Sequence, residues 1–184
     1  MCALLALAVL PLRVQPHFDG GMMIHTGYLS ATLPAQAYAA SGMSFGIGGT
    51  MRFHVGKVVR IGGEGFISTL NLMGNGSYVR IGWGGVVAEA RWQFGRWHPF
   101  AGATIGGGTA ATLLVFDGEA EDWTAEPNTV FHSEGFMIAD PHLGLEYALT
   151  ERIMLTSRLS WLLPFREVDV PLGPRVFVGF AFRH

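Results

Sequence analysis

Residues 43 to 55 alternate between apolar side chains and small or polar ones, with Gly49 as the exception among the apolar positions. The odd positions include Phe45 and Ile47, and the even positions include Arg52. Successive side chains of an extended strand point to opposite faces, so this segment is predicted to be a strand with one apolar face. The same period recurs in four further segments, at 59–67, 136–149, 152–163 and 175–183. We therefore expect an all-β fold.

Residues 78–94 show the same alternation with a change of phase. The apolar side chains of residues 79–83 stand at odd positions, whereas those of residues 86–94 stand at even positions. A β-bulge at Gly84–Gly85 would reconcile the two parts, because an inserted residue reverses the alternation. It would also place Arg80 on the polar face. The expected number of strands reaches eight with two less regular segments, 21–32 and 100–116.

The connections between these strands alternate in length. Tight turns are expected around Gly56–Lys57, Gly95–Arg96 and Thr150–Glu151, and longer loops at 33–41, 73–77, 117–131 and 164–174. In an up-and-down barrel with an even number of strands, this order places the tight turns and both termini at one end and the long loops at the other. We therefore expect a single barrel domain over residues 20–184.

Residues 1–19 precede this domain as an N-terminal segment. The apolar run Ala3–Leu12 is shorter than the roughly 20 residues that a transmembrane helix needs, and it contains Pro11. It is interpreted either as the remnant of a secretion signal or as a periplasmic extension. A helical membrane protein is excluded.

The alternation alone does not say which face of the barrel is apolar, because a soluble lipocalin-like barrel has the same period with its apolar face inside. Only 14% of the residues are charged and 49% are hydrophobic. Soluble domains carry roughly a quarter charged residues, so the small and polar face would make a poor water-facing surface. Composition therefore favours an apolar face turned to lipid. A net charge of -2 provides no basic field for nucleic acid.

Two segments carry a family resemblance. Residues 98–107 read HPFAGATIGG and are similar to a Pro-aromatic-x-Gly-x-Gly strand opening, and residues 176–182 read VFVGFAF and are similar to a C-terminal strand recognised by the barrel-assembly machinery. With these motifs, residues 20–184 resemble the OmpA/OmpX-type eight-stranded outer-membrane β-barrel family. The resemblance implies an antiparallel up-and-down transmembrane barrel in a bacterial-type outer membrane. Members act as anchors, adhesion surfaces or lipid-modifying enzymes, so it assigns no activity.

The polar faces of the strands carry ten ionisable side chains that are expected to point into the lumen. They are Arg52, Arg60, Glu64, Arg80, Glu89, Arg91, Asp140, His142, Glu146 and Arg158. One interpretation is a proton path or a narrow polar channel. The interpretation we favour is an internal network of salt bridges, because buried charges must be paired and an eight-stranded barrel is just wide enough to be filled by side chains.

Three residues are weak candidates for hydrolytic chemistry: His132, Ser133 and His142. A base, a hydroxyl and a carboxylate are the groups that hydrolysis needs. Outer-membrane lipid deacylases place a Ser and a His on one side of a strand, whereas the adjacent His132 and Ser133 point oppositely. We therefore expect no catalytic site. His132 and Glu134 share a face, but two ligands do not define a metal site, and no metal or cofactor is expected.

One predicted loop is strongly acidic. Its carboxylates are Asp117, Glu119, Glu121, Asp122 and Glu126. Divalent cations bridging to lipid headgroups, or a basic partner, are one interpretation, and a solvated loop is the simpler one.

The sequence thus favours a non-enzymatic outer-membrane barrel that acts as an anchor or as a subunit of an envelope assembly through its long loops. Its expected surroundings are outer-membrane lipid, lipopolysaccharide and envelope proteins, with tight turns and termini in the periplasm and long loops outside the cell. The alternatives are a lipid-modifying hydrolase, a small-solute channel and a soluble lipocalin-like ligand-binding barrel.

Overall fold

The computed structural model describes residues 18–33, 38–72, 76–116, 128–165 and 173–183. Within them the strands are β1 (Phe18–Leu33), β2 (Tyr38–Val55), β3 (Val59–Leu72), β4 (Ser77–Arg91), β5 (Trp97–Phe116), β6 (Asn128–Ala148), β7 (Ile153–Trp161), β8 (Leu163–Pro164) and β9 (Pro174–Arg183). This part of the chain has no helix long and apolar enough to cross a membrane. The first strand starts at Phe18, two residues before the expected domain boundary.

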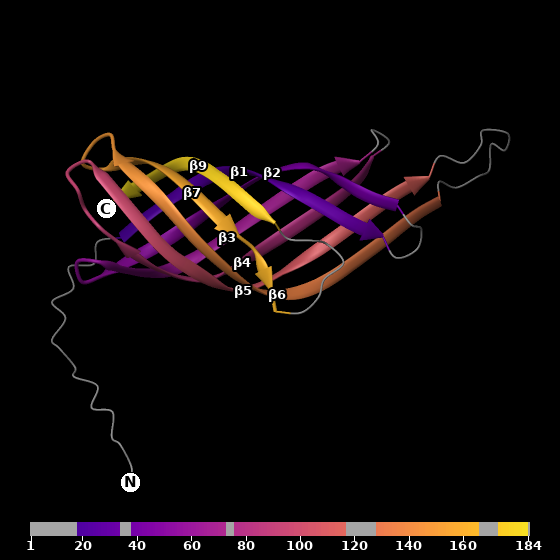
Figure 1. The fold of residues 1–184 in the computed structure, drawn as a ribbon, viewed down its shortest axis with the longest axis horizontal. Coiled ribbons are helices and arrows are strands. Elements are labelled where there is room, and N and C mark those ends of the chain that lie inside the picture. Colours follow the sequence, from indigo (N-terminus) through magenta and orange to yellow (C-terminus); the bar gives the residue numbers. More distant parts are fainter. Residues whose placement is uncertain (1–17, 34–37, 73–75, 117–127, 166–172, 184) are drawn as a thin grey trace, which may run out of the picture.

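The strands close into one antiparallel barrel (Figure 1). From β1 to β7 each strand pairs with its neighbours in the chain, and the pairings of β7 with β9 and of β9 with β1 complete the ring. β7 and β8 both pair with β6 in a single register, so together they form one strand of the wall and the barrel is eight-stranded. Closure leaves no sheet edge around the ring, which is the condition for a sheet to span hydrocarbon. The predicted fold class is confirmed.

Leu162 separates β7 from β8. The ladder with β6 runs as far as His142 opposite Ser160 and resumes at Ala139 opposite Leu163. Pro141 lies in the β6 stretch between these pairs. Because proline has no backbone N–H to donate, it accounts for a local break in the ladder.

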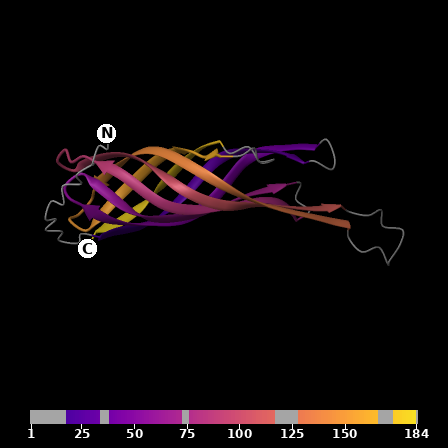
Figure 2. The same ribbon diagram turned by 90° about the horizontal axis from the view of Figure 1, so that it is seen from below.

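The three tight turns follow β2, β4 and β6, as predicted. Gly56 and Gly95 adopt positive φ values of 77° and 62° in the first two turns, a conformation that glycine adopts without steric cost. In the third turn, the N–H of Leu149 donates to the carbonyl of Ile153 at 3.0 Å. These turns lie at the end of the barrel where β9 finishes, and the β5–β6 hairpin projects furthest at the opposite end (Figure 2). We call the two ends the turn end and the loop end.

The described side chains alternate between the lumen and the outer wall along the strands. Phe45 and Ile47 are 68% and 46% exposed on the outer wall, whereas Arg52 is only 3% exposed inside. The lumen is polar near the turn end. Near the loop end it is apolar, and the buried side chains there include Leu29, Leu70, Leu72, Val79, Ile81, Phe136, Ile138 and Leu162.

The predicted β-bulge at Gly84–Gly85 is absent from the described part of β4. Gly84 pairs with Gly65 and Gly85 with Glu64, so the ladder continues without an inserted residue. The odd positions face the lumen along the whole strand, which buries Trp83 and leaves Arg80 exposed. The change of sequence phase has another cause: the lumen itself changes from apolar at the loop end to polar at the turn end. Arg80 is therefore not a lumen residue.

Candidate functional site: the charged lumen

The turn end of the lumen holds two arginines that share three carboxylates. Arg52 reaches Asp19, Glu89 and Glu146 with nitrogen–oxygen distances of 2.7, 2.9 and 3.1 Å. Arg60 reaches the same three carboxylates at 3.1, 2.7 and 2.8 Å. All five side chains are buried and come from five parts of the wall, because β1, β2, β3, β4 and β6 each contribute one. The planar, multi-donor guanidinium suits this geometry, since it can bind several carboxylates at once.

Further groups surround this cluster on the side of the turns. The Nε of Arg91 donates to Glu146 at 2.9 Å, and its Nη2 lies against Nδ1 of His98. His54, on β2, contacts the second oxygen of Asp19 at 2.8 Å. Every carboxylate at this end therefore has at least two partners, as the burial of ionised groups requires.

A second cluster lies halfway along the lumen. Arg158 binds Glu64 through two nitrogens, at 2.5 and 2.9 Å, and Asp140 at 2.7 Å. The hydroxyl of Thr104 donates to Glu64 at 2.6 Å. His142 connects the two clusters, because its Nε2 lies 3.0 Å from Glu89 and its Nδ1 lies 3.1 Å from the carbonyl of Asp140.

Arg175, on β9, lies deepest toward the loop end. It is 1% exposed, and its three nitrogens have no hydrogen-bond acceptor among the described residues. Its guanidinium carbon lies 4.7 Å from the centre of the Trp83 ring, within cation–π range. With Arg175, the part of the lumen that the structure describes contains five buried arginines and five buried carboxylates: Arg52, Arg60, Arg91, Arg158, Arg175, Asp19, Glu64, Glu89, Asp140 and Glu146. The formal charges of these groups therefore cancel.

Aromatic rings fill the space between the charges. The guanidinium of Arg60 lies 5.3 Å from the centre of the Phe100 ring, and that of Arg158 lies 5.6 Å from the centre of the Phe66 ring. Inward-facing glycines make room for the rings, since a Cβ at Gly144 would collide with Phe100 and one at Gly48 with Phe66. The lumen is consequently packed with side chains, as the width of an eight-stranded barrel allows.

The structure brings nine of the ten predicted lumen charges inside and leaves Arg80 outside, where its guanidinium lies 5.0 Å from the Tyr78 ring. Asp19 and Arg175 belong to the lumen although neither was among the ten. Arg175 precedes the outward-facing Val176, so the alternation of the sequence already indicated that Arg175 points into the lumen. Asp19 was assigned to the N-terminal segment, and only the ladder with β2 and β9 places it in a strand.

The three candidates for hydrolysis do not come together. His132 and Ser133 are exposed near the loop end of β6, whereas His142 is buried in the lumen. Ten residues of strand separate His132 from His142, a distance of about 33 Å. The described residues also contain no group of three or more side chains suited to hold a metal ion. The acidic residues Asp117, Glu119, Glu121, Asp122 and Glu126 lie outside the described residues.

The outer wall carries exposed aromatic side chains at two levels. Trp92, Phe94 and Trp97 lie near the turn end, and Tyr28 and Trp161 lie toward the loop end, all at least 44% exposed. Between these levels the wall is apolar, which is the arrangement that matches the two interfaces of a bilayer. The fold and its filled interior define a transmembrane β-barrel with an ionic core.

Solved structures with a similar fold include several outer-membrane barrels. Neisserial surface protein A has a TM-score of 0.57 and 15% identity, over 91% of this chain and 95% of that one. OprG from Pseudomonas aeruginosa also has a TM-score of 0.57, with 11% identity over 92% and 95%. The N-terminal barrel domain of Pseudomonas aeruginosa OprF has a TM-score of 0.53, with 11% identity over 91% and 97%. No protein-family model and no curated protein matches the sequence. The expected OmpA/OmpX-type fold is confirmed.

Proposed function

We propose that this chain is a non-enzymatic bacterial outer-membrane barrel that serves as a rigid anchor for its loops, and that these loops join it to other envelope components. The observation that carries the proposal is the packed, charge-balanced lumen. A scaffold needs a wall that does not deform, and ion pairs that join five strands at once hold the wall in one register.

The same packing argues against a solute channel. Arg52 and Arg60 occupy the turn end together with three carboxylates, and aromatic and aliphatic side chains fill the lumen above them. An ion crossing the barrel would have to displace buried pairs, which costs several kcal/mol for each uncompensated charge.

The charges at the turn end support a periplasmic position for that end. The described turns expose Lys57, Arg96 and Arg152 and one carboxylate, Glu151. Cations are favoured beside anionic phospholipid headgroups, at about 1 kcal/mol each. The long connection 117–127 instead carries five carboxylates in its sequence. We propose that it faces the exterior, where divalent cations can bridge it to lipopolysaccharide.

Orientation and loop contacts can be tested with the same two positions, His132 at the loop end and Lys57 at the turn end. In a Cys2→Ser background, a membrane-impermeant maleimide should label His132→Cys in intact cells and Lys57→Cys only after lysis. A photo-crosslinking residue at position 132 should give an adduct with an envelope protein or lipopolysaccharide that position 57 does not give.

Labelling of Lys57→Cys in intact cells would contradict the orientation. Crosslinking at position 132 that yields no adduct, or the same adduct as position 57, would contradict the loop-mediated role. Equal amounts of each variant in the outer-membrane fraction, with the heat-dependent gel shift of a folded barrel, are the control.

A further inference from the structure

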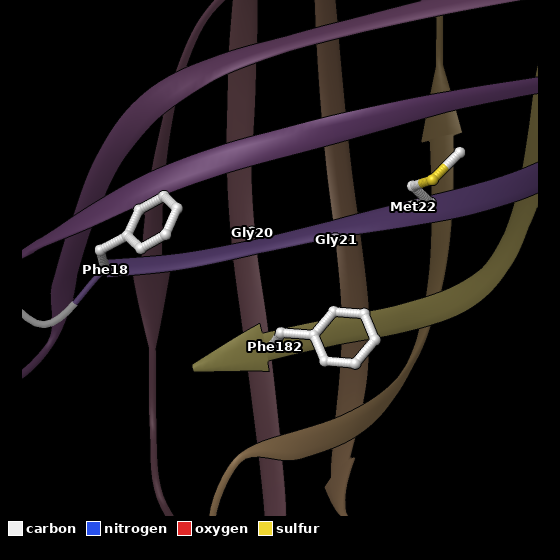
Figure 3. Close-up of a pocket in the computed structure, with 5 residues that line it drawn as sticks. All are labelled: Phe18, Gly20, Gly21, Met22 and Phe182. Atoms are coloured by element: carbon white, nitrogen blue, oxygen red, sulfur yellow. The ribbon is translucent and has the colours of Figure 1, made fainter. Parts of the chain in front are cut away.

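The outer wall has an apolar groove at the turn end, between β1 and β9. It has a volume of about 380 Å³ and is lined by Phe18, Gly20, Gly21, Met22 and Phe182. Figure 3 shows Phe18 and Met22 at the two ends of this stretch of β1, with the two glycines between them and Phe182 beside them on β9. Gly20 is paired with Phe182, so the missing side chain at Gly20 forms the floor of the groove.

An exposed cation, Arg152, lies on the β6–β7 turn, next to the β9 side of the groove. Arg152 precedes Ile153, which pairs with Phe182 of the groove, and the carbonyl of Arg152 accepts a hydrogen bond from the N–H of Arg183 at 2.8 Å. Arg152 is exposed, and its guanidinium has no ion-pair partner in the part of the chain that the structure describes. Glu151 is the nearest exposed carboxylate in the sequence. Lys57, on the β2–β3 turn, adds a second exposed cation on the other side of β1.

We propose that this groove holds one acyl chain of an anionic phospholipid and that Arg152 binds the phosphate of its headgroup. The groove is lined by apolar atoms and almost no polar ones, so it suits the acyl tail of the lipid and not its headgroup. Arg152 and Lys57 supply positive charge that is complementary to the phosphate, at the end of the barrel where the headgroups of the adjacent lipid leaflet lie. Exposed Trp97 and Phe94, on the opposite side of the ring, place the membrane interface at the turn end as well.

The path for the chain continues along β1. A second apolar groove, of about 360 Å³, is lined by residues that include Ile24, Phe45, Val176 and Val178. The two grooves follow each other on the outer face of β1, from Phe18 to Thr26, which is about 26 Å of strand. This length accommodates an extended acyl chain whose headgroup lies at the turn end.

The test is native mass spectrometry of the folded, detergent-solubilised full chain, titrated with phosphatidylglycerol or with phosphatidylcholine of the same acyl chains. Gly20→Leu fills the groove, and its Cβ would meet only ordinary contacts of 3.4 and 3.5 Å. Gly65→Leu is its matched control, because Gly65 is outward-facing, with 3.8 Å to the nearest atom, and lies on β3, which lines neither this groove nor the second apolar groove on β1. Arg152→Gln removes the cation. Arg96→Gln is the control on the opposite side of the ring.

We expect the wild-type protein to retain phosphatidylglycerol in preference to phosphatidylcholine. Arg152→Gln should lower its apparent affinity by about fivefold, the effect expected for the loss of one membrane-facing cation. Gly20→Leu should lower it by a similar factor because the leucine side chain occupies the groove, while the two controls stay within about twofold. Glu151→Gln should raise it. Equal losses in Arg96→Gln and Arg152→Gln, or an unchanged affinity in Gly20→Leu, would overturn the site. This binding in detergent is independent of the orientation and loop role proposed above, so the two proposals can fail separately.

Discussion

Arg158 and Glu64 form a two-point ion pair across the lumen, with Nη1 2.5 Å from Oε2 and Nη2 2.9 Å from Oε1. Their Cα positions belong to β7 and β3, which are not neighbours in the sheet. The pair therefore ties together parts of the wall that no backbone ladder connects.

Breaking this pair should be costly. Arg158→Met leaves the carboxylates of Glu64 and Asp140 buried without their cation, and we expect it to lower the free energy of unfolding by about 3 to 5 kcal/mol. Adding Glu64→Gln should recover part of that loss, because it removes one of the unpaired charges. Urea unfolding in detergent, followed by tryptophan fluorescence, measures both. A loss below about 1 kcal/mol, or strictly additive effects, would show that the pair does not hold the wall.

Arg175 provides the matched comparison, since it is equally buried but donates no hydrogen bond within the described residues. Arg175→Met should lower the free energy of unfolding by no more than about 1 to 2 kcal/mol, because the lost cation–π contact is offset by removal of a buried charge that has no hydrogen-bond acceptor. The same urea titration measures it. A loss as large as that of Arg158→Met would mean that Arg175 has a strong ionic partner.

Gly144 tests the packing of the aromatic rings inside the barrel. A Cβ at this position would collide with Phe100, so Gly144→Ala should destabilise the barrel by about 1 to 3 kcal/mol through overpacking. Gly65→Ala, on the open outer wall, should change stability much less. The fraction of each variant that keeps the heat-dependent gel shift over a temperature series reports the difference. Equal behaviour of the two variants would argue against a filled lumen.

Thiol labelling in a Cys2→Ser background can check which side chains of β4 face the lumen at the loop end. Arg80→Cys should react with a membrane-permeant maleimide in the folded protein, whereas Ile81→Cys, at a site with 0% exposure, should react only after unfolding in urea. The opposite pattern would restore the predicted bulge and turn Trp83 to the lipid.

The period-two pattern predicted eight strands, and the small share of charged residues then predicted the outward direction of Phe45 and Ile47, because the alternation by itself does not say which face meets lipid. It failed at Trp83, since the pattern reports only that two faces differ and the lumen changes polarity along its length. It also missed the place of Asp19, whose strand assignment depends on pairing with Arg52 and Arg183. The sharing of carboxylates by Arg52 and Arg60 depends on strand register, which a single sequence does not encode locally.

The central claim is that side chains seal the barrel from end to end, and conductance across a planar bilayer tests it most directly. The folded protein, inserted at a density confirmed by fluorescence of a labelled fraction, should carry no ionic current above that of the bare bilayer. Stable unitary current steps that appear with insertion of the folded protein would contradict the account.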